Sequence, residues 1–144
     1  MKRVSADQLE YPGDGLYYLQ GSPFTGIAFR LHGNGAPRSE LEYRDGLRWG
    51  MSREWYAPEQ PMVEAPYFKG VLHGRAREWH RNGQLAEDGE YEYGIALWER
   101  EWDEDGTLTS EHELSESEPD YETLRQYREL YGRDSGAAPG RAGR

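Results

Sequence analysis

The sequence predicts an all-β protein: an antiparallel β-hairpin meander of repeated units that forms one elongated, twisted sheet, followed by a single C-terminal α-helix. Two observations predict this fold. Glycine, tyrosine and tryptophan recur with a period of 24 residues, which indicates a repeat architecture. Short runs rich in aromatic residues alternate with Asn-Gly and Asp-Gly dipeptides, which is typical of hairpins and not of helices.

Several residue classes share the 24-residue step, so the period does not depend on one residue type. Two sets of glycines lie four residues out of phase, and tyrosine, tryptophan and Asn-Gly positions keep the same step. A fourth unit, one residue shorter, covers 98–114. The recurring positions are Gly46/Gly70/Gly94, Gly26/Gly50/Gly74, Tyr43/Tyr67/Tyr91, Trp55/Trp79 and Asn34-Gly35/Asn82-Gly83.

Each unit reads as two strands joined by a tight turn. A run such as 75–80 leads to Asn82-Gly83, and a second run such as 88–92 returns. Asn-Gly favours type I′ turns, which need positive φ at both central residues. One unit has Ala57-Pro58-Glu59 at this place, which predicts a wider hairpin. Because one unit cannot bury its apolar side alone, about four units must stack into one sheet of roughly eight to ten strands.

A different pattern follows the repeats. Ser117 at a cap position, Pro119 in the first turn and Gly132 past the end predict a helix, and an apolar stripe gives it one buried face. We expect this helix to cover the last unit and protect its edge. The stripe consists of Tyr121, Leu124, Tyr127, Leu130 and Tyr131. The predicted organisation is an N-terminal lead-in (1–15), the repeat sheet (16–114), the helix (115–132) and a disordered tail (133–144).

Composition limits the function. The chain has 144 residues, a formal net charge of −10 and no cysteine, which excludes disulfides, thiolate metal sites and a cysteine nucleophile. The acidic balance argues against direct nucleic-acid binding and against anionic membranes. Leu, Ile, Val and Phe make up only about 15% of the residues, which alone would suggest disorder, but the repeat explains how 5 Trp and 11 Tyr are packed. We expect a cytoplasmic protein.

The repeat motif resembles the bacterial variant of the MORN repeat. The resemblance rests on Asp45-Gly46-x-x-x-Gly50-x-x-x-x-Trp55-Tyr56 and on Lys69-Gly70-x-x-His73-Gly74-x-x-x-x-Trp79-x-x-Asn82-Gly83-Gln84-Leu85. It covers about residues 9–114 and implies a sheet of β-hairpin repeats. Many bacterial members are described as antitoxin or immunity-type proteins, while other MORN proteins are scaffolds or are linked to membrane lipids. The family implies no catalytic motif, and a fold does not determine a function.

One predicted sheet face carries a row of small residues, a row of charged residues and a row of His and Tyr. Repeat-equivalent residues usually share a structural role, but this face is also a candidate for partner contact or for acid–base or metal chemistry. His32 and His80 lie two units apart, which is too far to hold one ion, so no metal site is predicted. The candidate binding residues are His32, Glu54, Tyr56, Glu78, His80 and Glu101.

The second strands of the units have their own alternation, in which tyrosines point one way and an acidic stripe points the other. Such a stripe repels itself unless it is solvated or matched by a basic partner, so it indicates either a soluble outer face or a partner surface. Its members are Glu40, Glu42, Glu64, Asp88, Glu90 and Glu111. Two further expectations concern packing: the row Trp55, Trp79 and Trp102 belongs to the core, and His73 is a solvent-facing turn residue.

No Ser-His-Asp order, phosphate-binding loop or HExxH motif is present, so neither catalytic residues nor cofactors are predicted. The favoured hypothesis is a non-catalytic protein-binding module, in its most specific form an antitoxin or immunity-type protein that neutralises a partner protein, with a basic toxin as one candidate. An enzyme or small-ligand protein with a pocket on a concave sheet face is one alternative. A self-associating scaffold is the other, and the sequence leaves the oligomeric state open.

Overall fold

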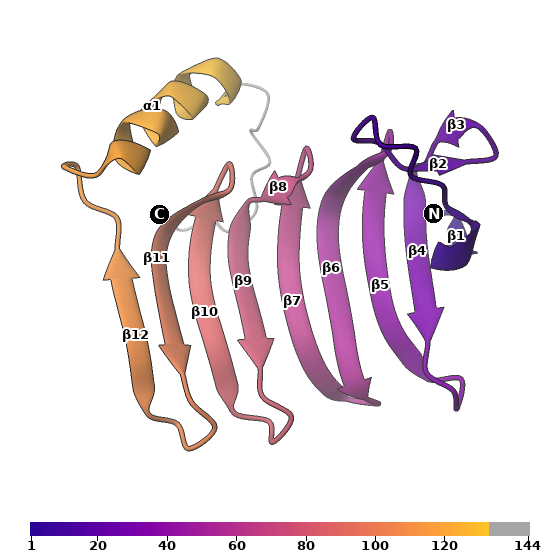
Figure 1. Ribbon diagram of the computed structural model, residues 1–144, viewed down its shortest axis with the longest axis horizontal. Coiled ribbons are helices and arrows are strands. Elements are labelled where there is room, and N and C mark those ends of the chain that lie inside the picture. Colours follow the sequence, from indigo (N-terminus) through magenta and orange to yellow (C-terminus); the bar gives the residue numbers. More distant parts are fainter. Residues whose placement is uncertain (133–144) are drawn as a thin grey trace.

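The computed structural model describes residues 1–132 and shows one long, mostly antiparallel sheet with a single α-helix and one short 3-10 helix, η1 (Ala6–Gln8) (Figure 1). The predicted all-β fold class is confirmed. Along the sheet the strand order is β1-β4-β5-β6-β7-β9-β10-β11-β12, β8 extends β7, and β2 and β3 form a separate hairpin. The strands are β1 (Arg3–Ser5), β2 (Tyr18–Leu19), β3 (Ser22–Pro23), β4 (Gly26–Leu31), β5 (Pro37–Arg44), β6 (Leu47–Ala57), β7 (Gln60–Phe68), β8 (Val71–Leu72), β9 (Gly74–Trp79), β10 (Leu85–Glu92), β11 (Ile95–Trp102) and β12 (Leu108–Glu113). The tail predicted over 133–144 lies outside the described residues.

The type I′ geometry occurs at one end of the sheet only. There, Asp45-Gly46, Lys69-Gly70 and Tyr93-Gly94 have positive φ at both residues, as this turn requires. The three turn glycines donate equivalent backbone hydrogen bonds, each to a carbonyl of the preceding unit at 2.8 Å. These carbonyls belong to Phe24, Arg48 and Leu72, which are themselves one period apart.

The predicted type I′ turns at the other end are wrong. At Asn34-Gly35 and Asn82-Gly83 only the glycine has positive φ, and the asparagine side chain accepts a hydrogen bond from the backbone two residues on, an Asx turn. Each hairpin also shifts register near this end, because its returning strand carries one extra residue, a β-bulge. The hairpin at Pro58-Glu59 is narrow and not wider: Ala57 pairs directly with Gln60, because Pro58 presets φ and Glu59 takes φ 60°.

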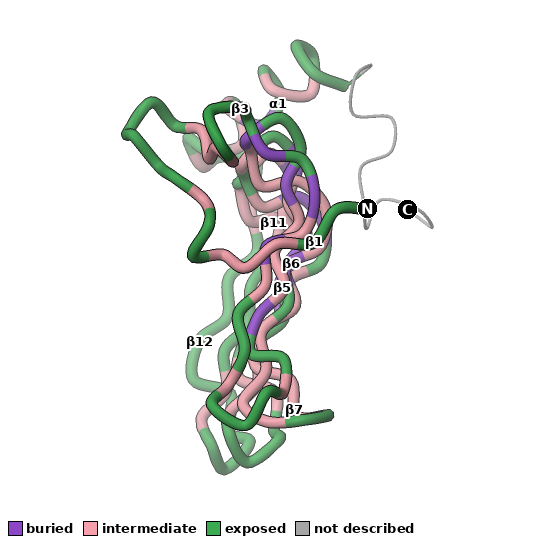
Figure 2. The backbone as a smooth tube through the Cα atoms, turned by 90° about the vertical axis from the view of Figure 1, so that its right-hand side faces the viewer, coloured by how far each residue is buried: buried purple, intermediate pink, exposed green. Residues whose placement is uncertain are grey.

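The sheet is thin, and few side chains are fully buried (Figure 2). Within residues 1–132, an apolar core cluster lies at the N-terminal end, where Phe24, Ala28 and Tyr43 are 5% exposed or less. The predicted lead-in supplies its cover, because Val4 and Leu9 pack against it and β1 pairs in parallel with β4. The predicted tryptophan core is wrong: Trp55, Trp79 and Trp102 are only half-buried, because they lie at the end of the sheet away from the C-terminal helix (Figure 1), where no segment within residues 1–132 packs over them.

Helix α1 covers Pro119–Tyr131, and its N-cap residue is Glu118. The prediction that Ser117 is the cap is therefore wrong by one residue. The helix lies across the end of the sheet that carries the type I′ turns (Figure 1). Leu124 is buried, and Arg128 donates two hydrogen bonds of 2.9 and 2.8 Å to the carboxylate of Glu92, which is 2% exposed. The expected protection of the sheet edge is therefore wrong: all six residues of β12 are exposed. No helix within residues 1–132 is long and apolar enough to cross a membrane.

Candidate partner-binding groove

A groove of about 360 Å³ runs along one face of the sheet over β6, β7, β9, β10 and β11. We call this the groove face and the opposite one the ladder face. The groove exists because the residues at its floor are small. These small residues are Ala65, Ala76 and Gly89, and Ala76 pairs directly with Gly89 on the neighbouring strand. The rows above and below carry longer side chains, so the two rows become walls.

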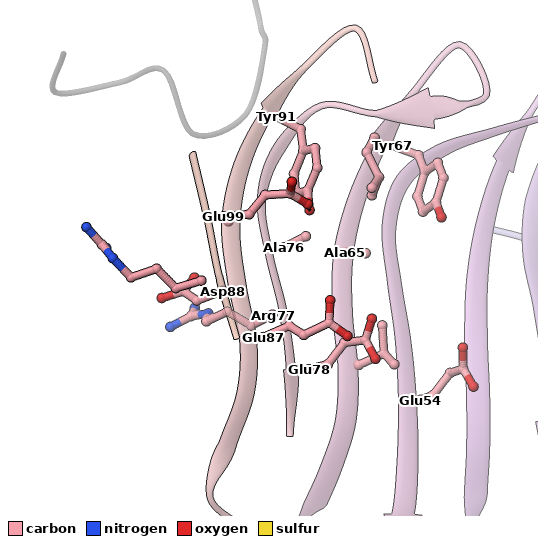
Figure 3. Close-up of a pocket in the computed structure, with 14 residues that line it drawn as sticks. Glu54, Ala65, Tyr67, Ala76, Arg77, Glu78, Glu87, Asp88, Tyr91 and Glu99 are labelled. Atoms are coloured by element: carbon pink, nitrogen blue, oxygen red, sulfur yellow. The ribbon is translucent and has the colours of Figure 1, made fainter. Parts of the chain in front are cut away.

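Tyrosines form one wall. Figure 3 shows Tyr67 and Tyr91 on this side, with Ala65 and Ala76 between them and the acidic side. Tyr91 donates a hydrogen bond of 2.9 Å to Glu99, and burial together with this carboxylate raises the pKa of the Tyr91 hydroxyl. Gly89 makes this position possible: a Cβ at residue 89 would lie 3.1 Å from the Tyr91 ring and 2.9 Å from the Trp98 carbonyl oxygen.

Carboxylates form the other wall. The pairing register places Glu78 beside Glu87 and Glu87 beside Glu101, on neighbouring strands. Val63 lies between Glu54 and Glu78 in the same row. With Glu99 from the next row these residues form a set that we call the groove carboxylates. The set is Glu54, Glu78, Glu87, Glu99 and Glu101.

The groove carboxylates repel one another. The pKa of Glu78 is raised, first by burial and then by Glu54 and Glu101. The pKa of Glu87 is raised in the same way, by burial and then by Glu78, Glu101 and Glu99. No ion pair between residues 1 and 132 includes a groove carboxylate. The arrangement can therefore attract cations, because a positive group placed in the groove would lower this repulsion.

The predicted binding residues separate into two groups. Glu54, Glu78 and Glu101 lie in or beside the groove, but His32, Tyr56 and His80 do not line it. Each of these three side chains instead donates a hydrogen bond to the backbone of the next unit. The acceptors are the carbonyls of Trp55, Trp79 and Trp102, at 3.1, 2.8 and 2.8 Å. Their repetition thus has a structural role, in which one unit is tied to the next.

The predicted acidic stripe lies on the ladder face, where arginines alternate with it. Glu40 pairs with Arg3 at 2.9 Å, Asp88 with Arg75 at 2.6 Å and Glu111 with Arg100 at 2.8 Å. These three members of the stripe are therefore neutralised within the sheet itself. Glu64 lies 4.0 Å from Arg53, Glu90 is flanked by Arg75 and Trp98, and Glu42 lies against Gly50.

Sequence reasoning missed three notable positions. Glu87 and Glu99 line the groove, and simple alternation from Tyr91 through Gly89 would have placed Glu87 on the same face as the tyrosine. The prediction that His73 faces solvent is wrong, because His73 is 0% exposed and lies between the rings of Phe68 and Tyr93. Its Nδ1 accepts a hydrogen bond from the Tyr93 backbone. The period aligns His73 with Trp49 and Leu97, a signal of a buried position.

The described part of the chain also bears on metal binding. No cluster of three or more potential metal ligands occurs within residues 1–132.

The fold and the groove together define a β-hairpin repeat protein with one acidic, grooved face.

Comparison with known proteins gives the family. The chain is 38% identical over 128 residues to the immunity protein YwqK of Bacillus subtilis (strain 168), and the match covers 89% of this chain and 80% of that protein. The chain belongs to the family of this immunity protein. No protein-family model matches the chain. One solved structure, the accessory secretory protein 1, 2 and 3 complex of Streptococcus pneumoniae, matches 78% of this chain and 19% of that chain at 13% identity and a TM-score of 0.34, which is too weak to bear on fold or function.

Proposed function

We propose that this protein is an immunity-type protein that neutralises a partner protein by binding a cationic segment of it in the groove. The observation that carries the proposal is the set of groove carboxylates, which line or flank one groove without an ion pair inside the described chain. The family of the immunity protein YwqK supports the immunity role. The proposal includes hairpin units of the MORN-variant type and action in the cytoplasm.

The physical reason for a cationic partner is that repulsion between the groove carboxylates destabilises the folded sheet. Side by side on adjacent strands, like charges destabilise a sheet by a few tenths to about 1 kcal/mol for each pair. A sheet selected for stability alone would carry an arginine at one of these positions, as the ladder face does. An arginine or lysine side chain from a partner would supply the missing charge, and the wall of Tyr67 and Tyr91 would pack against its alkyl chain.

The rows also fit an extended segment better than a compact ligand. The groove runs across five strands, so its length follows the repeat, and its carboxylates succeed one another from strand to strand. A partner loop with spaced arginines or lysines can contact several of them at once. Long-range attraction by such a surface mainly accelerates encounter and selects the register of binding.

A growth-rescue assay tests the proposal. The product of the gene beside this one is expressed in a host, alone and together with this protein. We expect growth arrest by the neighbour alone and recovery on co-expression. The variant E54Q/E78Q/E87Q/E101Q should fail to restore growth, because it removes four of the five charges that attract the partner.

The matched control removes the same amount of charge elsewhere. E59Q/E104Q/E116Q/E129Q changes only exposed residues outside the groove and should restore growth as the wild type does. Direct binding is measured on the purified pair by calorimetry, and its affinity should fall as salt rises. A neighbour without toxicity, or rescue that survives in the groove variant, would contradict the proposal.

A further inference from the structure

Eight charged side chains of alternating sign follow one another across the ladder face. The Arg3 guanidinium lies over the ring of Phe29 in β4 and reaches Glu40 in β5. From there the register pairs Glu40 with Arg53, Arg53 with Glu64, Glu64 with Arg77, and so on to β12. The full order from β4 to β12 is Arg3, Glu40, Arg53, Glu64, Arg77, Asp88, Arg100 and Glu111.

The side chains in the middle of this ladder make the weakest ion pairs. Glu64 lies 4.0 Å from Arg53, compared with 2.6 to 2.9 Å for the ion pairs of Asp88, Glu111 and Glu40. Arg77 makes no ion pair with any residue between 1 and 132. The two residues are neighbours in register, yet their side chains do not meet.

An even ladder that begins with a cation and ends with an anion is complementary to its own reverse. A two-fold axis that is parallel to the strands and passes between β7 and β9 turns the face over and reverses the strand order. It places β7 over β9 of the other copy and β4 over β12. Every arginine of this ladder then faces a carboxylate of the same ladder in the other copy, and the central contacts join Glu64 to Arg77 of the second molecule. Arg75, in the next row of the face, keeps its ion pair with Asp88 of its own chain.

The aromatic row near the hairpin ends has the same symmetry. Each first strand carries a large side chain there, paired with a smaller one on the returning strand. Reversal of the order places Trp79 against Pro61 and Trp55 against Leu85, so each indole meets a smaller side chain. The row is Leu31, Pro37, Trp55, Pro61, Trp79, Leu85, Trp102 and Leu108.

We propose that the ladder face is an interface on which a second copy of this chain binds across this two-fold axis. The composition fits, because tryptophan and arginine are the residues that contribute most to interface energies. Eight strands about 4.8 Å apart and about 20 Å long offer roughly 700 Å² on each copy, close to the standard size of a stable interface. Leu31 and Leu108, which are 51% and 45% exposed, would be covered at its two ends.

The proposal uses other side chains than the groove carboxylates, which alternate onto the opposite face. Of the ladder residues, Arg77, Asp88 and Arg100 also line the groove, whereas Glu64 does not, so E64R and E64C leave the groove lining unchanged. In the dimer both grooves point outward. The failure of one proposal therefore leaves the other untouched, and the two are tested with different variants.

Charge reversal at the centre tests the interface. By sedimentation at about 50 μM, well above the micromolar constants at the weak end for interfaces of this size, we expect the wild type to be a dimer. In R77E the introduced carboxylate faces Glu64 of the second copy, and in E64R two cations meet. Each variant alone should dissociate roughly 100-fold more readily, because two like-charge contacts replace two attractive ones. An equimolar mixture of the two variants should form a heterodimer, because both central contacts are then attractive again.

A cysteine pair keeps the test decisive even where a reversed charge prevents folding. The chain has no cysteine of its own, so E64C and E111C each carry one. In the proposed dimer the two residues 64 lie about 11 Å apart and the two residues 111 about 35 Å apart. A short bis-maleimide should therefore link E64C covalently to its copy and leave E111C without a cross-link.

A monomeric wild type overturns the proposal. A dimer whose affinity neither charge reversal changes also overturns it, because the interface then lies elsewhere. Equal cross-linking of E64C and E111C contradicts the placement of the axis. Heterodimers that form only from the mixed variants support it, since a purely structural role of the ladder would give two destabilised chains that do not recognise each other.

Discussion

Two regions of the groove face lie two periods apart in the sequence, and one is covered by other parts of the chain while the other is open. In the N-terminal region Ala28 pairs with Leu41, below Tyr43. In the later region Ala76 pairs with Gly89, below Tyr91. The backbone positions are equivalent, and the tyrosine is the same. The first region is the buried core of the molecule, and the second is an open groove.

The difference comes from what lies on top. Val4, Leu9 and Tyr17 pack on the first region, and the Tyr17 ring centroid is 5.2 Å from that of Tyr43. No segment within residues 1–132 covers the second region, and its row of longer side chains is acidic: Glu78 stands where Arg30 stands two periods earlier. The same face of a repeat sheet thus forms the core where the chain folds back on it, and elsewhere remains exposed as an open groove.

The largest expected effect is the loss of a side chain in the covered region. F24A removes a ring that is 2% exposed and should lower the free energy of unfolding by about 3–5 kcal/mol, because a cavity replaces buried apolar contact. Urea denaturation followed by tryptophan fluorescence measures this loss. Y67A, in the wall of the open groove, should cost clearly less. Equal losses would show that the two regions do not differ in packing.

Helix α1 is a second cover, and its anchor should come next in size. R128M leaves the buried carboxylate of Glu92 without its guanidinium and should cost about 2–4 kcal/mol. The control R125M removes a helix arginine whose ion pair with Glu122 is exposed on both sides, so it should cost less than about 1 kcal/mol. Urea unfolding of both variants gives the comparison. A cost for R128M no larger than that for R125M would mean that the helix does not depend on this pair.

An alanine in place of Gly89 sharpens the comparison, because the equivalent position in the covered region holds Leu41. G89A forces its methyl group against the Tyr91 ring and the Trp98 carbonyl, and should cost about 1–3 kcal/mol. G33A serves as the control, since a Cβ at residue 33 meets nothing within 4 Å. Unfolding in urea reports the cost. Tyr91 should also lose its hydrogen bond to Glu99, seen as a lower tyrosine pKa in a spectroscopic titration.

The smallest effect concerns the groove carboxylates and depends on pH. Because folding raises the pKa of Glu78 and Glu87 above 4.5, the folded chain holds protons that the unfolded chain has already released just above this pH. The contribution of these two residues to the stability should therefore rise as the pH falls from 7 through this range. E78Q/E87Q should be more stable than the wild type at pH 7 by up to about 1 kcal/mol, and the gap should close by about pH 4. Urea unfolding at several pH values measures it. A gap independent of pH would exclude charge repulsion as its cause.

Much of the fold follows from the sequence because period and alternation are local properties. The 24-residue step defines the units, and alternation assigns Tyr43, Tyr67 and Tyr91 correctly to one face. Features that depend on distant parts of the chain escape this reasoning. The lead-in has no period that would reveal it as the cover of the core. The position of α1 depends on the Arg128–Glu92 pair, which joins residues 36 positions apart.

The candidate site was predictable only in part. Glu54, Glu78 and Glu101 come from first strands, where alternation is regular. Glu87 follows the bulge at Ala86 on a returning strand. On the returning strands, the prediction considered only the acidic residues of the other face. The neutralisation of those residues by arginine depends on register across strands, which a single sequence does not show. His32, Tyr56 and His80 were recognised as equivalent, but their backbone acceptors lie in the next unit.

The bonds that join successive units have a consequence for how such a chain can change in length. Each unit is tied to the next at one end by a turn glycine and at the other by a His or Tyr side chain, and both links repeat every 24 residues. Duplication of one whole unit would reproduce both links at the new junction and leave the N-terminal core and α1 in place. The groove would then grow by one pair of strands, so its reach is adjustable in discrete steps, by copying and not by redesign.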